Sequence, residues 1–323
     1  MKPQKILVTG GAGFIGFHVA CALGRNGNDV TVVDNLSRGR LDDDLKSAIA
    51  KKLFTFKEAD LTKSLSFPKP FDAIVHLAAI NGTRYFYEKP HDVLRVNLLS
   101  CINVLEYAKN FPKTRLLFSS SSEAYVGAIQ HYNEKVPTPE EIPLCIDDIR
   151  NVRYSYAASK IAGESLFFSY CHIYKNPLVV VRFHNIYGPR MGCEHVIPEF
   201  IGRSLKGEDP FVIKGGKETR AFCYVDDAAD ALGLLLSRQM SSDLYHIGND
   251  SEEIAIQALA KRVLLACNVK PSLKVDPAPK GSVARRCPDI TKLRSLGYAP
   301  KVNLDEGIKR TVAWYRKVYP DGF

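Results

Sequence analysis

The chain has 323 residues, 46% hydrophobic and 24% charged, which is enough to form roughly two domains with full cores. Its net charge of +9 is spread along the chain without a long basic run, which argues against nucleic-acid binding and suits a small anionic ligand or a solvated surface. The eight cysteines form no Cys-x-x-Cys pair, and no apolar run reaches the roughly 20 residues that span a bilayer. We therefore expect reduced thiols, no metal site, no membrane contact and a cytoplasmic location.

Short β-branched runs alternate with segments of helical length over roughly the first 180 residues. Helices are expected over 92–110 and 156–174. Several strands are apolar on both faces, which is typical of a parallel sheet covered by helices. The alternation predicts an α/β doubly wound sheet. The predicted strands are 5–10, 29–34, 53–60, 72–79, 114–120 and 177–183.

Three glycines, Gly10, Gly13 and Gly16, join the first predicted strand to the helix that follows it. Glycines there allow a tight turn and let backbone N–H groups approach a pyrophosphate. Asp34 ends the second predicted strand, where a carboxylate can accept hydrogen bonds from an adenosine ribose. The combination predicts a dinucleotide site, and Asp34 favours NAD over NADP, although Arg38 lies close in sequence.

The remainder of the chain is organised differently. Residues 128–150, with three prolines and many charges, predict a long surface loop. After residue 183, glycine and proline punctuate shorter elements, which indicates a smaller second domain. We expect an NAD-binding domain over 1–182 that is rejoined near 221–247, and a substrate-binding domain over 183–323.

Tyr156 and Lys160 stand four residues apart in RYSYAASKIAGE, so a helix places them on one face. An ammonium group one turn away, together with a positive nicotinamide ring, would stabilise the phenolate of Tyr156. That phenolate could exchange a proton with a sugar hydroxyl while the nicotinamide ring takes the hydride.

The segments TGGAGFIG, HLAA, YAASK, RFHNIYGPR and FCYVDDAADAL, with the serine-rich strand end, resemble the extended short-chain dehydrogenase/reductases that modify nucleotide sugars. The resemblance implies a Rossmann fold, tightly held NAD and a C-terminal domain for a UDP-, GDP-, CDP- or dTDP-linked sugar. It also implies a homodimer formed by the helices that carry Asn97 and Tyr156.

The same resemblance implies the roles of individual residues. Counting four back from Tyr125 makes Ser121 the catalytic serine beside Tyr156 and Lys160, although Val126 is an insertion in the turn that follows. The implied cofactor contacts are Gly10, Gly13, Phe14, Ile15, Gly16, Asp34, Asn35, Arg38, Asp60, Leu61, Leu77, Ala78, Ala79, Asn97, Ser119, Tyr156, Lys160 and Phe183. The implied substrate contacts are Asn81, Thr83, Ser121, Asn185, Val196, Arg220, Arg285 and Arg286.

Glu123 suggests more than a simple 4-epimerase, because such family members carry small neutral residues there. Dehydratases and UDP-glucuronate decarboxylases resemble this sequence more closely at that position, and a carboxylate can remove the C5 proton once C4 is a ketone. Ser122 disfavours the glucose-type dehydratases but not the GDP-mannose type. The stretch RFHNIYGP is similar to GDP-mannose 3,5-epimerases, whose acid and base are a cysteine and a lysine. When the neighbouring residues are aligned, Glu123 falls at the position of that cysteine and His195 at the position of that lysine. Our hypothesis is that they transfer protons at C5 or C3.

The sequence thus predicts an NAD-dependent nucleotide-sugar epimerase/dehydratase that works through a transient 4-keto intermediate. The alternatives are a plain UDP-sugar 4-epimerase, a UDP-glucuronate decarboxylase and an NADP-dependent keto-sugar reductase. A non-catalytic dinucleotide sensor on the same fold is a further alternative. Such sensors typically lose the tyrosine or the lysine, whereas this chain keeps Ser121, Tyr156 and Lys160.

Overall fold

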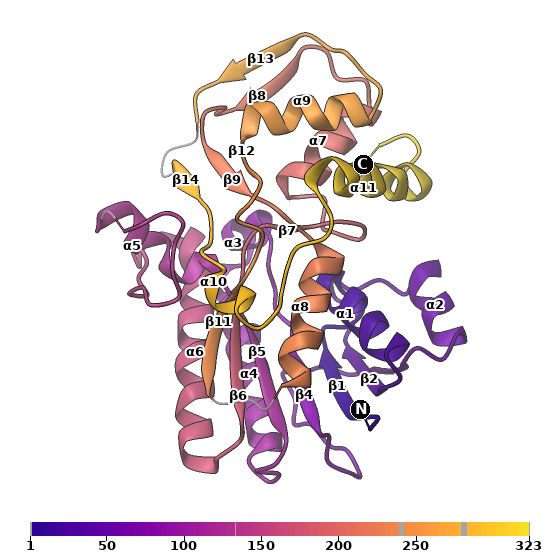
Figure 1. Cartoon of the computed structure of the whole chain (residues 1–323), viewed down its shortest axis with the longest axis vertical. Helices are drawn as coiled ribbons and strands as arrows, with labels where there is room; N and C mark the ends of the chain where they lie inside the picture. The colour runs from indigo at the N-terminus through magenta and orange to yellow at the C-terminus, as the bar shows by residue number, and fades with distance from the viewer. Residues whose placement is uncertain (1, 133, 239–241, 279–282, 323) are drawn as a thin grey trace. The chain divides into compact units, whose positions relative to one another are not determined.

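A computed structural model describes residues 2–132, 134–238, 242–278 and 283–322 (Figure 1). Its contacts divide the chain into two compact units. The first unit comprises Met1–Ala128, Pro143–Phe183 and Ala229–Tyr245. The second unit comprises Ile129–Ile142, His184–Ala228 and His246–Phe323. The chain enters the second unit at Ile129, and each later crossing returns it to a unit that it has already left once.

The first unit is built on a seven-stranded sheet in the order β11-β6-β5-β4-β1-β2-β3. The neighbouring strands from β6 to β3 all pair in parallel, which confirms the predicted doubly wound sheet. The order reverses between β1 and β4, and ligands of such sheets bind at that point, beyond the carboxyl ends of the strands. The strands are β1 (Lys5–Thr9), β2 (Asp29–Asp34), β3 (Thr55–Glu58), β4 (Ala73–His76), β5 (Arg115–Ser121), β6 (Leu178–Phe183) and β11 (Asp243–Ile247).

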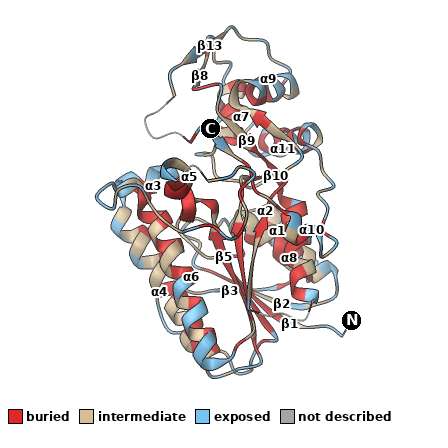
Figure 2. Cartoon of the chain, turned by 60° about the vertical axis from the view of Figure 1, so that its left-hand side comes forward, coloured by how far each residue is buried: buried red, intermediate tan, exposed pale blue. Residues whose placement is uncertain are grey.

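Helices cover both faces of this sheet, with α4 and α6 on one side and α1, α2 and α8 on the other (Figure 2). The two long helices predicted from the sequence are confirmed as α4 and α6. The helices and short turns are α1 (Phe14–Arg25), α2 (Asp43–Ala50), α3 (Thr83–Glu88), α4 (Pro90–Ala108), η1 (Ser122–Tyr125), α5 (Val126–His131), η2 (Val152–Tyr154), α6 (Ser155–Tyr174) and α8 (Val225–Ser237).

The contact between α6 and β5 is close because Gly163 has no side chain. A Cβ at that position would lie 2.5 Å from the ring of Phe118. The Phe118 ring is stacked on Phe167, with centroids 4.5 Å apart, and also on His76. This buried stack fixes the distance between the helix and the strand, and both elements carry candidate catalytic residues.

The second unit consists of short strands and amphipathic helices. Within it, α7, α9 and α11 pack against one another. Strand β9 pairs with both β12 and β14, β10 pairs with β7, and β13 pairs with β8. The elements are β7 (Ile186–Tyr187), α7 (Val196–Leu205), β8 (Phe211–Lys214), β9 (Thr219–Ala221), β10 (Cys223–Tyr224), β12 (Glu253–Ala255), α9 (Ile256–Ala266), β13 (Leu273–Asp276), β14 (Arg285–Arg286), α10 (Thr291–Arg294) and α11 (Leu304–Val318).

The segment predicted as a surface loop over 128–150 is partly buried, so that prediction is wrong in its middle. Thr138 is 1% exposed, and its N–H donates to the carbonyl of Cys287 over 2.9 Å. The side chain of Glu140 accepts a hydrogen bond of 3.0 Å from the N–H of His246, and burial raises the pKa of this carboxyl. The many charged residues of the segment suggested an exposed loop. One of them, Glu140, is instead buried and hydrogen-bonded within the second unit.

The other expectations about thiols, metals and membranes concern absences. None of the eight cysteines, all of which lie in the described part of the chain, is in a disulfide. Among the described residues no three His, Cys, Asp or Glu side chains are grouped so as to hold a metal. No described helix is both long enough and apolar enough to cross a membrane.

Candidate active site

The first unit brings Ser121, Tyr156 and Lys160 together. Ser121 ends β5, whereas Tyr156 and Lys160 lie in the first two turns of α6. The Lys160 ammonium donates a hydrogen bond of 2.6 Å to the carbonyl of Ser119 and lies 5.5 Å from the centre of the Tyr156 ring. The side chains of Ser121 and Tyr156 are hydrogen-bonded. A hydroxyl, a phenol and an ammonium group thus converge at the carboxyl end of β5.

The protonation of this group is governed by burial. Burial raises the pKa of the Tyr156 phenol above its ordinary value, the Glu123 charge raises it further, and the Ser121 hydrogen bond and the Arg38 charge lower it. Burial also lowers the pKa of Lys160 to about 8. The sequence pointed to Lys160 as the group that favours the phenolate, whereas the groups that lower the pKa of Tyr156 in the structure are Ser121 and Arg38. A positive ring bound beside Tyr156 would act in the same direction.

Glu123 belongs to the same group of side chains. It lies in η1, directly after β5, and its N–H donates to the Ser121 hydroxyl oxygen over 3.2 Å. The half-buried carboxylate raises the pKa of both Tyr154 and Tyr156, which places its charge near the phenol. The inserted Val126 begins α5 and is 1% exposed, so the extra residue is absorbed by a buried helix start after the strand.

The glycine-rich turn after β1 has the shape of a phosphate cradle. Gly10 has φ +71°, and a Cβ there would lie 2.7 Å from the Cα of Ala78. A Cβ on Gly16 would lie 2.2 Å from the carbonyl oxygen of Gly10. Gly13 precedes α1 and supplies no side-chain cap, so the first N–H groups of the helix suit an anionic ligand. These residues fit the pyrophosphate of a dinucleotide.

Asp34 lies where the ribose of such a cofactor is expected. It ends β2, and its carboxylate accepts hydrogen bonds from the N–H groups of Ala12 (3.1 Å) and Leu36 (2.8 Å). The Arg38 guanidinium lies 4.9 Å above the Tyr85 ring. A carboxylate held in this way fits a pair of ribose hydroxyls.

Most of the remaining residues predicted to contact the cofactor or the sugar in the first unit lie near the ends of strands of the sheet, whereas Phe14 and Ile15 lie in α1, Thr83 in α3 and Asn97 in α4. The Asn97 amide is buried, and it donates to the Ile80 carbonyl and the Ser159 hydroxyl, so it joins α4 to α6. The Asn81 side chain accepts from the N–H of Gly82. The others are Phe14, Ile15, Asn35, Asp60, Leu61, Leu77, Ala78, Ala79, Thr83, Ser119 and Phe183.

The second unit contains the other predicted residues. Asn185 donates its side-chain amide to the carbonyl of Ala221 over 2.9 Å. His195 precedes α7, and Val196 is its first residue. Arg220 and Arg286 are register partners on the neighbouring strands β9 and β14. Glu123 and His195 therefore belong to different units.

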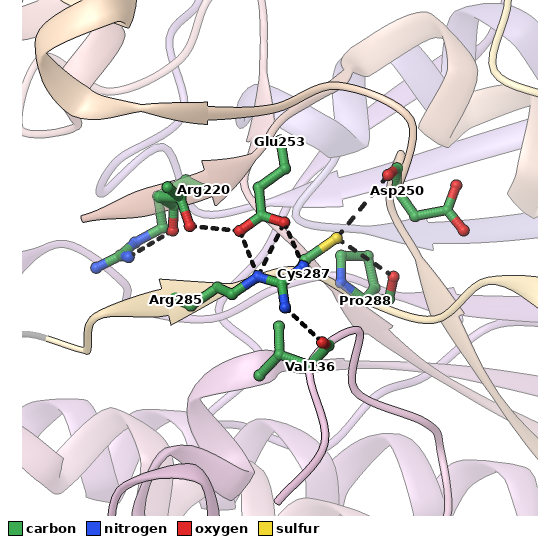
Figure 3. Close-up of polar contacts among 8 residues, drawn as sticks. Val136, Arg220, Asp250, Glu253, Arg285, Cys287 and Pro288 are labelled. Carbon is green, nitrogen blue, oxygen red and sulfur yellow. Dashed lines mark hydrogen bonds and ion pairs between the residues drawn. The ribbon is translucent and has the colours of Figure 1, made fainter. Parts of the chain in front are cut away.

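Arg285 is held by other side chains of its own unit (Figure 3). Its guanidinium donates to both carboxylate oxygens of Glu253, at 2.8 Å each, and to the carbonyl of Val136 at 2.6 Å. The arginine that the resemblance assigned to a diphosphate is thus bound to a carboxylate in this structure.

A buried ion pair that was not predicted from the sequence lies on the same helix as the catalytic group and is hydrogen-bonded to the same strand. Arg182 donates to both oxygens of Glu164 at 2.8 Å, and the Ser120 hydroxyl donates to Glu164 at 2.5 Å. Glu164 lies one turn after Lys160, on the same face of α6. The four-residue spacing from Lys160 to Glu164 could have indicated that Glu164 belongs to this group. Its partner Arg182 could not be found in the same way, because it lies 18 residues further along the chain.

Comparison with known proteins agrees with this geometry. The sequence profile of the NAD dependent epimerase/dehydratase family matches residues 6–248. The UDP-N-acetyl-alpha-D-glucosaminuronate decarboxylase of Bacillus cytotoxicus is 32% identical, over 98% of this chain and 99% of its own. UDP-glucuronic acid decarboxylase 5 of Arabidopsis thaliana is 34% identical, over 94% of this chain and 87% of its own. The solved UDP-N-acetylglucosamine 4-epimerase of Methanobrevibacter ruminantium has a TM-score of 0.86 at 27% identity, and the match covers 98% of this chain and 100% of that one.

The sheet order, the glycine cradle and the neighbouring serine, tyrosine and lysine have the arrangement of an extended short-chain dehydrogenase/reductase. The chain belongs to the NAD-dependent epimerase/dehydratase family. It is an enzyme of this family, and NAD is its cofactor.

Proposed function

We propose that the enzyme oxidises C4 of a nucleotide sugar and continues the reaction from a transient 4-keto intermediate. The Tyr156 phenolate takes the proton of the C4 hydroxyl, and Ser121 donates a hydrogen bond to the C4 oxygen as the ketone forms. Bound NAD supplies the hydride acceptor and a positive ring. The convergence of Ser121, Tyr156 and Lys160 beside the glycine cradle supports this proposal most directly.

Glu123 would then act on the ketone. A C4 ketone makes the C5 proton acidic, and the Glu123 carboxylate would take it. The effect of the Glu123 charge on the pKa of Tyr156 supports this role. Loss of water across C5 and C6 from the resulting enolate gives a dehydratase, whereas return of the proton to the other face gives a 5-epimerase. We propose His195, in the second unit, as the partner of Glu123 in proton transfer at C5 or C3.

Decarboxylation is the second candidate, because two of the relatives named above are decarboxylases of UDP-linked uronic acids. A C6 carboxylate lies β to a C4 ketone, so the C5–C6 bond can break with release of CO2. The electron pair of that bond forms an enolate, which takes a proton at C5. Glu123 would supply that proton in this reaction.

The two units would share the ligands. We propose that the residues of 1–182 and the return segment hold NAD, and that residues of 183–323 hold the nucleotide sugar. Asn185, Val196 and Arg220 would bind the nucleotide sugar, and Arg285 or Arg286 would meet its diphosphate. We also propose a cytoplasmic homodimer formed through α4 and α6, and the exposed side chains of Phe168 and Ile173 on α6 support that interface.

The test is a panel of UDP-, GDP-, CDP- and dTDP-linked sugars and UDP-uronic acids, incubated with the purified enzyme in D2O. Mass and proton NMR spectra separate loss of water, loss of CO2 and epimerisation. Solvent deuterium at C5 or C3 supports the role of Glu123. Inversion at C4 without deuterium reduces Glu123 to a binding residue and leaves a plain 4-epimerase. The absence of any change in the whole panel contradicts the proposal.

A further inference from the structure

The short helix α3 lies against the catalytic tyrosine, although nothing assigned above explains its sequence. The Phe86 ring in α3 is stacked on the Tyr156 ring, with centroids 5.5 Å apart and planes 17° apart. Phe86 is 9% exposed and Tyr156 is 8% exposed. Val93 completes this small buried cluster. One face of the catalytic phenol is therefore covered by an aromatic ring.

The position of α3 is fixed relative to α6. Gly82 has φ +121°, a conformation that favours glycine, and α3 starts directly after it. The Asn97 side chain accepts from the N–H of Ile80, on the segment that leads to α3, and donates to the hydroxyl of Ser159. Ser159 in turn donates to the carbonyl of Tyr156 over 2.7 Å. One buried amide thus ties the approach to α3 to the helical turn that carries the tyrosine.

Tyr85, the residue of α3 before Phe86, packs against a charged side chain. The Tyr85 ring carries the Arg38 guanidinium at 4.9 Å, and the Arg38 charge lowers the pKa of Tyr156. The groups that face the phenol are therefore Ser121 from β5, Glu123 from η1, Lys160 from α6 and Arg38 from the loop after β2. Phe86 is the apolar side chain that packs against the Tyr156 ring, and this stacking limits how far the phenol ring can tilt.

We propose that Phe86 is a positioning residue for the reaction: its ring fixes the plane of Tyr156, so that the phenol oxygen meets the Ser121 hydroxyl and the reacting sugar oxygen. This inference rests on the proposed function, in which Tyr156 transfers the proton. An offset aromatic pair favours a defined ring orientation. Misplacement of a proton-transfer group slows the step even when both ligands are still bound.

The experiment compares Phe86→Leu, which removes the ring, with Phe86→Tyr, which keeps it. Tyr87→Leu is the matched control, because Tyr87 is the next residue of α3 and is 55% exposed. The first readout needs no substrate: the ionisation of Tyr156 in the NAD-bound enzyme, followed by tyrosinate absorbance and isolated by subtracting the Tyr156→Phe variant. The second readout is reduction of bound NAD in a single turnover with UDP-glucose or UDP-glucuronate.

Leucine is apolar and keeps Tyr156 covered, so the burial that raises the pKa of Tyr156 should change little. We therefore expect Phe86→Leu to raise this pKa further, because the Ser121 hydrogen bond that lowers it is weakened. The single-turnover rate should fall about 2- to 10-fold with unchanged UDP and NAD binding. Phe86→Tyr should restore both readouts, and Tyr87→Leu should change neither.

An unchanged Tyr156 titration in Phe86→Leu overturns the inference, whatever the rate. A variant that instead loses bound NAD and melts at a lower temperature also overturns it, because Phe86 is then only a core residue. If neither these two sugars nor any other of the panel reduces NAD in the wild-type enzyme while Phe86→Leu still shifts the titration, the positioning contact stands and the proposed function fails.

Discussion

Arg182 and Glu164 form a two-point ion pair in which each side chain is at most 5% exposed. The pair joins β6 to α6, and the Ser120 hydroxyl adds β5 to it. Lys160, one turn earlier in α6, donates to the Ser119 carbonyl. Two successive turns of the helix thus hold two successive residues of the strand that ends at Ser121.

Arg182→Met should be among the most destabilising single changes in the first unit, because it leaves the Glu164 charge buried without a partner. We expect a loss of about 3–5 kcal/mol in the free energy of unfolding. Thermal melting of the NAD-bound enzyme measures it. The double variant Arg182→Met with Glu164→Gln should recover part of the loss. Arg150→Met, which breaks an ion pair whose arginine is 88% exposed, is the control and should change stability by no more than about 1 kcal/mol.

Tyr156→Phe should abolish most of the chemistry and leave the cofactor in place. Removal of the phenol oxygen deletes the proton-transfer group, so we expect turnover to fall about 10²- to 10⁴-fold. The measurement is kcat with the identified nucleotide sugar, together with NAD content from the absorbance of the denatured protein. Tyr154→Phe, the neighbouring buried tyrosine, is the control. Equal losses in both variants would show that the effect is one of folding.

Glu123→Gln should block solvent exchange at the ring carbon while NAD stays bound and C4 is still oxidised. The amide keeps the shape of the side chain but cannot take the C5 proton. Deuterium incorporation from D2O, read by proton NMR, is the measurement, and His195→Gln should behave in the same way if the two act as a pair. Glu141→Gln, at an exposed position, is the control and should exchange like the wild type. Undiminished exchange in Glu123→Gln would refute the assignment.

His76 should make stability depend on pH between about 3 and 6.5. The Thr9 hydroxyl oxygen accepts from the N–H groups of Leu77 and Ala78, and it is hydrogen-bonded to Nδ1 of His76 over 2.8 Å. Burial lowers the pKa of this histidine from 6.5 to about 3. The unfolded chain therefore binds a proton in this window that the folded chain does not, and the contribution of the group to stability is lost as the pH falls.

Melting curves of the wild type and of His76→Gln, taken from pH 7 down to 4, check this linkage. The stability difference between the two proteins should narrow by up to about 1.4 kcal/mol per pH unit below pH 6.5. A difference that stays constant across the range would mean that the histidine is not held neutral.

Glu253→Gln should strengthen UDP binding, because the neutral amide competes less for the Arg285 guanidinium that we expect at a diphosphate. We expect about a 2- to 5-fold lower Kd, in keeping with a half-exposed ion pair. Calorimetry with UDP at low salt measures it. Glu306→Gln, which breaks a comparable exposed pair with Arg310 in α11, should leave the Kd unchanged. Weaker binding in Glu253→Gln would mean that Glu253 positions Arg285 for the ligand.

The features that could be predicted from the sequence are those with a local pattern. The predicted strands of the sheet and the helices α4 and α6 are confirmed, because apolar period and turn residues mark them within a few positions. The glycine turn and the Tyr156 to Lys160 spacing are local in the same sense. Their catalytic and binding roles stay predictions until the variants above are measured.

The features that could not be predicted depend on partners distant in the chain. Thr138 pairs with Cys287, and Arg285 binds Val136 and Glu253, so no window of the sequence contains both partners. Phe86 lies in a helix of six residues, too short for an apolar period to be read. Its stacking on Tyr156 follows from the three-dimensional path of the segment after β4.

Gly163 has a consequence for attempts to redesign this enzyme. The Phe118 ring that a methyl group at 163 would strike packs with His76 and Phe167 in one buried group of rings, so it has little room to move away. A Gly163→Ala change would push α6 outward, and Tyr156 lies seven residues, or roughly 10 Å, back along that helix. The absence of a side chain at Gly163 therefore helps to set the position of the Tyr156 phenol, two helical turns away. Variant libraries of this enzyme should therefore leave Gly163 unchanged.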